Sequence, residues 1–283
     1  MKSKLYPRSA GMTLADLLVV LILVPLSVTA FIGCWQRTNS GGSNRVKCAS
    51  NLRQIGQAIL LYSNENRGAY PQTTFADGAV VIPTWGTGAK ASNPFAAGGP
   101  EPNDVSAALF LLLRTQEITP EVFVCPSSNA EKWDLGGGSM TALNWSNWEG
   151  RDGMRSHLSY SYQNPYPDDA AVKAGFKLNN SISAEFAVAA DINPGTSGGQ
   201  NVLMVPMDAS SRDMRRANSR NHDTDGQNVL FGDGHVEFVA TAFCGVKRDM
   251  IYARRAGADG VKSSEVRNSP FDANDSVLLP TDE

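Results

Sequence analysis

The sequence has few of the residues on which metal-binding and nucleic-acid-binding proteins commonly depend. It contains only 3 histidines and 4 cysteines among 283 residues, and no two cysteines form a Cys-x-x-Cys pair. This spacing excludes the common zinc motifs that are built from paired cysteines. Basic residues number 25 against 28 acidic ones, for a net charge of −3. Because there is no cationic surplus to neutralise a phosphate backbone, we expect no nucleic-acid partner.

Long hydrophobic runs are also absent, with one exception near the N-terminus. Residues 14–35 form a run of 22 residues whose one charge is Asp16. At about 1.5 Å per residue a helix of this length measures about 33 Å, which is enough to cross a bilayer. Lys2, Lys4 and Arg8 precede the run without an acidic residue, which favours a cytoplasmic N-terminus. We therefore expect the rest of the chain to be exported.

The residues at the start of this run resemble the processing signal of type IV prepilins and type II secretion pseudopilins. Gly11 is followed by Met12, Thr13 and Leu14, and then by a carboxylate at Asp16 before further apolar residues. The family usually carries Glu at the position of Asp16. The resemblance implies that a prepilin peptidase cuts after Gly11 and methylates Met12. It also implies that Asp16 pairs with the terminal amine of a neighbouring subunit.

Other forms of processing stay open over the same run. The small residues at 28–30 form a passable site for ordinary signal peptidase, and residues 31–34 are similar to a poor lipobox ending at Cys34. An uncleaved anchor is the remaining alternative. A secretory core is commonly about 7–15 apolar residues, and the run here is longer. The length of the run therefore favours the prepilin signal.

The next part of the chain combines a glycine-rich break with an amphipathic helix. Residues 38–44 read TNSGGSN and predict a hinge over 37–44, after the membrane helix of 12–36. Residues 45–66 then carry apolar side chains at intervals of three and four, which predicts a helix packed by one face on a core. We expect a globular domain over 45–256 and a polar, loose tail over 257–283.

Two further segments resemble a large group of prepilin-like proteins that is abundant in planctomycetes. One is Cys48–Gly56, CASNLRQIG, and the other pairs His222 with Asp233 and Gly234. The group carries nine residues between the histidine and Asp-Gly, whereas this chain has ten. Its domain is widely catalogued as one of unknown function, so the resemblance implies a fold more than a biochemical role.

These observations predict an α+β, pilin-like fold in which the amphipathic helix packs on an antiparallel sheet with long loop insertions. We expect a buried helix over 106–114, capped by Asn103 or Asp104, and strands over 120–126, 157–162 and 186–190. Asp233 and Gly234 predict a two-residue hairpin turn. That register places Phe231 opposite Val236 and Val229 opposite Phe238, with all four side chains on one face.

The candidate binding residues are few. Asp223, Asp225 and Asp233 are weak calcium candidates, because the later carboxylate of a calcium-binding loop is missing. The competing interpretation is that His222 and Asp233 hold the loop and turn by hydrogen bonds. We therefore expect no cofactor. For an exported protein we predict a disulfide between Cys125 and Cys244, with separate buried thiols as the alternative.

The functional prediction is a structural subunit and not an enzyme, since no residue set supports catalysis. The expected partners are a prepilin peptidase, other pilin-like subunits and an inner-membrane assembly platform. The chain would cross the inner membrane once, with a periplasmic globular domain, and would then enter a filament in the periplasm or at the cell surface. The alternative is a membrane-tethered binding module that does not polymerise. It would hold a glycan or a protein partner through Trp133, Trp145 and Trp148. The competing interpretation is that these tryptophans pin their loop to the body of the domain, which is the commoner role of aromatic residues in such a loop.

Overall fold

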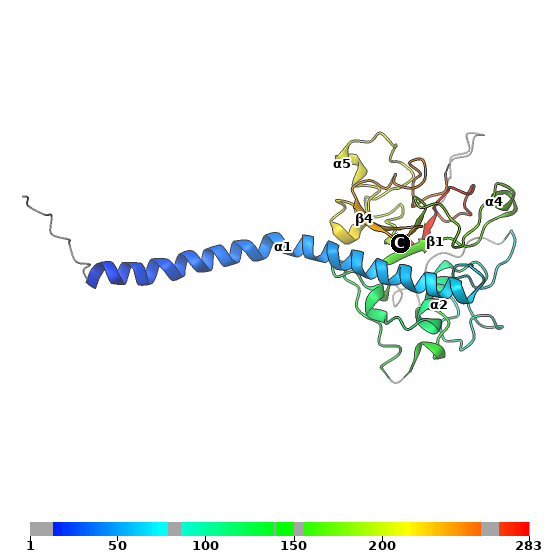
Figure 1. The fold of residues 1–283 in the computed structure, drawn as a ribbon, viewed down its shortest axis with the longest axis horizontal. Coiled ribbons are helices and arrows are strands. Elements are labelled where there is room, and N and C mark those ends of the chain that lie inside the picture. Colours follow the sequence, from blue (N-terminus) through cyan, green and yellow to red (C-terminus); the bar gives the residue numbers. More distant parts are fainter. Residues whose placement is uncertain (1–13, 79–85, 139, 150–155, 256–265, 283) are drawn as a thin grey trace, which may run out of the picture. The chain divides into compact units, whose positions relative to one another are not determined.

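The computed structural model describes residues 14–78, 86–138, 140–149, 156–255 and 266–282, and within α1 it omits the side chains of residues 15, 16 and 22–40. The chain divides into two compact units, Met1–Ser43 and Asn44–Glu283. The elements are α1 (Leu14–Glu65), α2 (Val105–Thr115), η1 (Pro120–Phe123), η2 (Ala142–Asn144), β1 (Tyr160–Gln163), α4 (Asp169–Lys173), β2 (Ala187–Asp191), α5 (Ser211–Met214), η3 (Arg220–His222), β3 (Gln227–Phe231), β4 (Val236–Val239) and β5 (Leu278–Leu279) (Figure 1).

Helix α1 is continuous over 52 residues, so the predicted break in helical structure at 37–44 is absent. The boundary between the two compact units, after Ser43, does fall within that range. A glycine in a helix costs about 1 kcal/mol relative to alanine, which a long hydrogen-bonded helix can absorb. Gly41 and Gly42 have open space where a Cβ would stand. No close packing therefore explains the two glycines.

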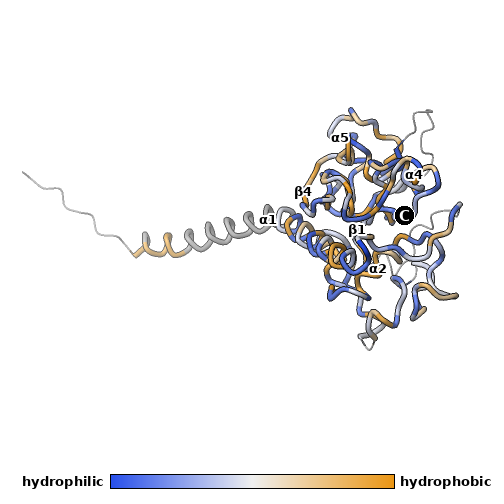
Figure 2. The backbone as a smooth tube through the Cα atoms, turned by 45° about the vertical axis from the view of Figure 1, so that its right-hand side comes forward, coloured by the Kyte–Doolittle hydropathy of each residue, from blue (hydrophilic) through white to orange (hydrophobic). Residues whose placement is uncertain are grey.

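The first unit begins with exposed apolar residues. Leu14 and the run from Leu17 to Leu21 are 46–78% exposed, and Figure 2 shows these turns as hydrophobic. Across the side chains that the structure describes, no helix is both long and apolar enough to span a bilayer. Most of the segment predicted to do so lies outside them, because the side chains of 22–40 are not described. Gly11, Met12 and the side chain of Asp16 lie outside the described residues too.

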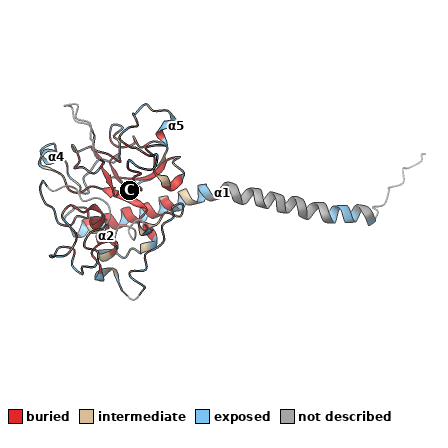
Figure 3. Ribbon diagram, turned by 180° about the vertical axis from the view of Figure 1, so that it is seen from behind, coloured by how far each residue is buried: buried red, intermediate tan, exposed pale blue. Residues whose placement is uncertain are grey.

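The second unit confirms the α+β class. Its sheet has the order β4-β3-β2-β1-β5 with antiparallel neighbours, and strands β1, β2 and β3 are buried throughout. The part of α1 in this unit packs on the sheet through Cys48, Leu52, Ile55 and Ile59, each at most 1% exposed (Figure 3). A Cβ at Gly56 would lie 2.9 Å from Leu230 Cδ1, so helix and strand approach closely there.

Helix α2 confirms the predicted buried helix. Asp104 is its N-cap and accepts a hydrogen bond from the Ala107 amide, and residues 105–113 are all buried. Phe110 lies against Trp133 and Trp148, with ring centroids 5.7 and 5.3 Å apart, and Trp145 lies 5.0 Å from Trp133. Because all three tryptophans are at most 6% exposed, they fasten their loop to the core and do not form a binding surface.

The hairpin forms where it was predicted, but its register differs by one residue. Leu230 lies opposite Val236 and Val229 opposite Glu237, because the turn contains three residues with Gly234 at φ +87°. A shift of one residue changes which side chains of the two strands share a face. Val229 and Val236 therefore lie on opposite faces of the sheet, which corrects the predicted shared face.

Two other segments differ from the sequence predictions. Residues 120–126 do not form a strand, because Pro120 starts the 3₁₀ helix η1, where its fixed φ is favourable. The end of the tail is not loose: β5 pairs with β1, and Val277, Leu278 and Leu279 are fully buried. The tail's polar composition concealed this short apolar run.

Candidate functional site

Four side chains that could act as metal ligands or in acid–base chemistry lie close together next to α1. They are Cys48 on α1, Cys125 just after η1, Asp191 at the end of β2 and His222 at the end of η3. One ligand atom from each lies within 4.8 Å of the others, and all four residues are buried. Residues from four separate segments thus converge on one point, which we call the Cys–His–Asp cluster.

The two cysteines of this cluster form a disulfide. Cys48 and Cys125 are 77 residues apart in sequence, and their Cα atoms lie 5.3 Å apart. The predicted partner of Cys125, Cys244, is instead a free thiol, so that pairing is wrong. Burial, followed by the charge of Asp249, raises the pKa of Cys244 to about 12. Cys244 is therefore a protonated thiol packed against the edge of the core, which makes it a poor nucleophile.

Asp191 is a fully buried carboxylate held by amide donors. Its Oδ2 accepts hydrogen bonds from the Asn228 backbone amide at 2.6 Å and from Asn228 Nδ2 at 3.1 Å. Its Oδ1 accepts a hydrogen bond from Asn221 Nδ2 at 3.2 Å. A buried carboxylate is stable only when such donors replace the water it has lost. The two asparagines thereby fix the position of both oxygens.

His222 faces this carboxylate and the disulfide. Its Nε2 lies 3.2 Å from Asp191 Oδ2, 3.1 Å from Asn228 Nδ2 and 3.8 Å from Cys125 Sγ. Helix η3 positions the imidazole ring. Ser219 caps the N-terminus of η3 by accepting a hydrogen bond from the Asn221 amide, and Asp223 ends the helix in the left-handed conformation. The imidazole is thus fixed in position by its neighbours.

The His…Asp-Gly signature does not form one site. Asp233 lies in the hairpin turn, where its Oδ1 accepts from the backbone amide and the ring of His235. These hydrogen bonds lower the pKa of Asp233. His222 belongs to the buried cluster, while the side chain of Asp233 is 48% exposed. The loop and the turn are therefore held by different contacts.

The calcium candidates do not gather. Asp225 is bound by Arg45 and Arg215, each at 2.9 Å, which occupies both of its oxygens. Asp223 and Asp233 are not grouped with it around a common point: among the described residues, the Cys–His–Asp cluster is the group whose geometry suits a metal ion. The acidic residues of this loop that suggested calcium therefore include one, Asp225, that serves ion pairing instead.

Cys48, Asp191, Asn221 and Asn228 were missed as site residues. Two signals were present in the sequence: Cys48 lies on the apolar face of its helix, and Asp191 directly follows the apolar run 186–190. A carboxylate that continues a buried strand must find donors, and this marks it as part of a site. Nothing in the sequence indicates which donors it finds, because they come from another part of the chain.

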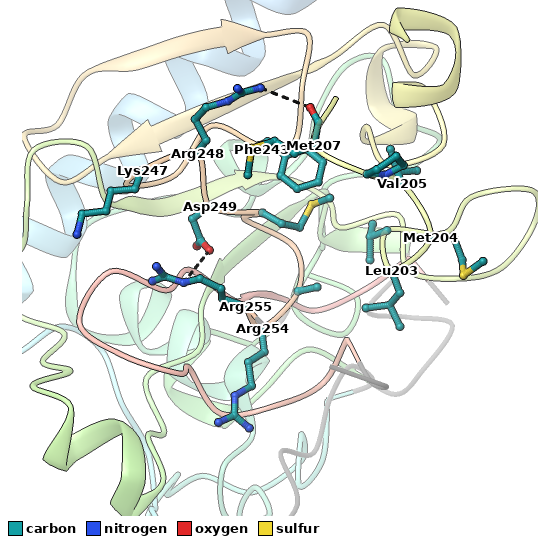
Figure 4. A pocket seen from close by; sticks show the side chains of 14 residues that line it. Leu203, Met204, Val205, Met207, Phe243, Lys247, Arg248, Asp249, Arg254 and Arg255 are labelled. Carbon is teal, nitrogen blue, oxygen red and sulfur yellow. Dashed lines mark hydrogen bonds and ion pairs between the residues drawn. The ribbon is translucent and has the colours of Figure 1, made fainter. Parts of the chain in front are cut away.

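A second feature is a groove of about 400 Å³ lined by residues of 202–207 and 243–255 (Figure 4). Its apolar lining includes Met204 and Met207, which are 68% and 44% exposed, and Arg248 donates to the Met207 carbonyl. Asp249 and Arg255 point toward each other in the groove, with Oδ1 and Nε 3.6 Å apart.

Asp249, which lines the groove, and Asp275 form a pair of buried carboxyl groups. Burial, then the charge of Asp275, raises the pKa of Asp249 to about 8, and burial raises that of Asp275 to about 6. Asp275 accepts from the backbone amides of Arg255 and Phe271, and Asp249 accepts from the Ser276 amide. The pair therefore anchors the segment that leads into β5, and burial favours the protonated form of both carboxyl groups.

Comparisons with family models, with curated proteins and with solved structures find no match to this chain.

Proposed function

We propose that this chain is a pilin-like subunit, cut after Gly11 and assembled into a type IV pilus-like or type II secretion pseudopilus filament. One observation carries the proposal. A single 52-residue helix begins with exposed apolar turns and, from Cys48 onward, supplies the core of an α+β unit. A helix that is apolar at one end and built into a globular unit at the other suits a subunit that assembles through its N-terminal half.

The exposed apolar turns require a nonpolar environment. Burying a leucine or valine side chain stabilises by about 1.5–3 kcal/mol, so Leu14 and residues 17–21 together represent a large driving force. The bilayer would cover these residues before assembly, and neighbouring helices would cover them in the filament. Asp16 would then pair with the terminal amine of a neighbouring subunit, which a prepilin peptidase exposes at Met12.

The second unit is fastened firmly to its part of α1. The Cys48–Cys125 disulfide links the helix to the segment after η1, Arg45 stacks on Phe238 at 4.2 Å, and Asn51 donates to Tyr160 Oη at 3.2 Å. A filament subunit pulled by its helix must resist separation of helix from sheet. These contacts provide that resistance.

The test begins with mass spectrometry of the mature N-terminus in purified membranes. We expect a chain that starts at N-methylated Met12. Asp16→Ala should then abolish incorporation into filaments, whereas Asp16→Glu, which retains the carboxylate, should assemble. A mature chain that starts after residue 28, or an Asp16→Ala variant that still assembles, would refute the proposal.

The alternative of a tethered binding module loses the residues on which it was based. It required Trp133, Trp145 and Trp148 at the surface, and all three are buried. We therefore propose filament assembly alone.

A further inference from the structure

We propose that, when its disulfide is reduced, the chain binds one zinc ion at the Cys–His–Asp cluster. The four ligands are the sulfurs of Cys48 and Cys125, Nε2 of His222 and Oδ2 of Asp191. The inference is independent of filament assembly, since all four residues lie in the second unit.

The spacing of the donor atoms suits a tetrahedral zinc site. Zinc binds nitrogen and oxygen at about 2.0–2.2 Å and sulfur at about 2.3 Å, so donors around it stand about 3.3–3.8 Å apart. His222 Nε2 lies 3.2 Å from Asp191 Oδ2 and 3.8 Å from Cys125 Sγ. All four donor atoms lie within 4.8 Å of one another. The wider pairs must therefore close by up to about 1 Å when zinc binds. The distance between the two sulfurs must lengthen instead, and reduction of the disulfide allows it.

The chemistry of the donors selects the metal. Two thiolates, one imidazole and one carboxylate are ligands that zinc accepts, whereas calcium and magnesium require mainly oxygen. Two thiolates and a carboxylate around a divalent ion leave one negative charge. The amide donors from Asn228 and Asn221 to Asp191 offset that charge.

The surrounding shell is already in place. Metal-ligating residues are commonly oriented by a second layer of hydrogen bonds, and here the two asparagines fix Asp191 before any ion arrives. Cys48, Cys125 and Asp191 are fully buried and His222 is 4% exposed. A bound ion would be shielded from water, as in a structural zinc site.

The disulfide and the metal are mutually exclusive states. A dithiol reductant gives two electrons and two protons to the Cys48–Cys125 bond, which yields two thiols, while the reductant becomes a disulfide. Zinc then binds the two sulfurs as thiolates and displaces the two protons into solvent. Either state joins α1 to the segment after η1.

The test uses the full chain in detergent with Cys34→Ser and Cys244→Ser, so that Cys48 and Cys125 are the remaining cysteines. The chain is reduced with a phosphine, freed of reductant without air and titrated with Co²⁺, whose absorption reports thiolate ligands and tetrahedral geometry. Zinc is then measured by competition. We expect one equivalent of metal in the reduced chain and none in the oxidised chain. No metal in the reduced chain, or equal binding in both states, would overturn the proposal.

Ligand variants identify the remaining donors. His222→Gln and Asp191→Asn should each weaken zinc binding at least 10-fold. Mutating a residue that merely orients a metal ligand typically costs about 10–100-fold in affinity, and losing the ligand itself should cost no less. His235→Gln is the matched control, since His235 lies in the exposed hairpin and should leave the affinity unchanged. Unchanged affinity in either cluster variant would refute the four-ligand site. If a variant fails to fold by circular dichroism, the comparison of reduced and oxidised chains decides.

Discussion

Asp249 and Asp275 connect the pH of the surroundings to the stability of this protein. Both carboxyl groups are buried, and each has a pKa above the usual value of about 4, chiefly because burial disfavours the charged form. Between about pH 4 and 8 the folded chain therefore binds more protons here than the unfolded chain does. By linkage, the free energy of unfolding contributed by this pair falls as the pH rises through that window.

We predict that Asp249→Asn removes most of this pH dependence. The amide keeps an acceptor for the Ser276 amide but has no charge to desolvate. Urea unfolding at pH 5, 6.5 and 8, followed by the fluorescence of the buried tryptophans, should give a flatter profile than that of the original chain. Asp233→Asn is the control: the pKa of this exposed carboxyl is lowered and lies below the window. An unchanged slope in Asp249→Asn would contradict the prediction.

The Cys48–Cys125 disulfide should be the largest single contribution at the scale of one residue pair. It closes a segment of 77 residues, for which the loop-entropy relation gives about 4.5 kcal/mol. We expect Cys48→Ala with Cys125→Ala to lower the free energy of unfolding by about that amount in metal-free, oxidising buffer. Cys244→Ala, which leaves the disulfide in place, should cost less, at most about 1–2 kcal/mol, because its small side chain is only partly buried. Equal losses in the two variants would mean that the disulfide does not stabilise the fold.

At the scale of the element, α1 carries glycines of two opposite kinds. Gly41 and Gly42 have no neighbour where a Cβ would stand, whereas at Gly56 it would approach Leu230 Cδ1 at 2.9 Å. The first pair weakens the helix without a packing reason, and Gly56 allows helix and sheet to approach. The same residue type therefore serves different purposes within one helix.

These glycines give opposite predictions for the same substitution. Gly41→Ala and Gly42→Ala should each stabilise the helix locally by about 1 kcal/mol, measured as slower amide hydrogen exchange over residues 38–46. Gly56→Ala should destabilise the second unit by about 1–3 kcal/mol in urea, because Leu230 must move. If Gly56→Ala stabilised the chain as much as Gly41→Ala, close packing at Gly56 would be excluded.

At the scale of the whole molecule, the C-terminal part of the described chain closes the sheet. Strand β5 pairs with β1, and Asn193 Nδ2 donates to the carbonyls of Leu278 and Tyr252, so residues far apart in sequence complete the edge. The second unit can therefore be completed only after the C-terminal segment has been made. Assembly through α1, as tested with Asp16→Ala and Asp16→Glu, concerns this complete unit.

Much of the fold was predictable from local pattern. Apolar spacing over residues 45–66 identified the packed part of α1, and the apolar run after Asp104 identified α2. The hairpin was predictable as an element because Asp233 and Gly234 suit a turn. Its register was not, since a three-residue turn shifts every pairing by one and only the backbone geometry around Gly234 distinguishes the two.

The candidate site was the least predictable part. His222 was singled out by its resemblance to a signature, but its partners lie on three other segments: Asp191 on β2, Cys125 after η1 and Cys48 on α1. A disulfide prediction from four cysteines has several possible pairings, and no spacing rule separates them. The burial of Trp133, Trp145 and Trp148 was the commoner expectation for aromatic residues in such a loop, and the structure confirms it.

The sequence by itself determined α2 and the packed part of α1, the class of fold and the hydrophobic start of α1, because these depend on the periodicity of neighbouring residues. The tertiary structure alone decided the Cys48–Cys125 bond, the Cys–His–Asp cluster, the hairpin register and the return of β5 to the sheet. Each of these depends on which distant segments the packed core brings within a few ångströms of one another. Local sequence patterns do not indicate which distant segments will meet, because that depends on how the whole core packs.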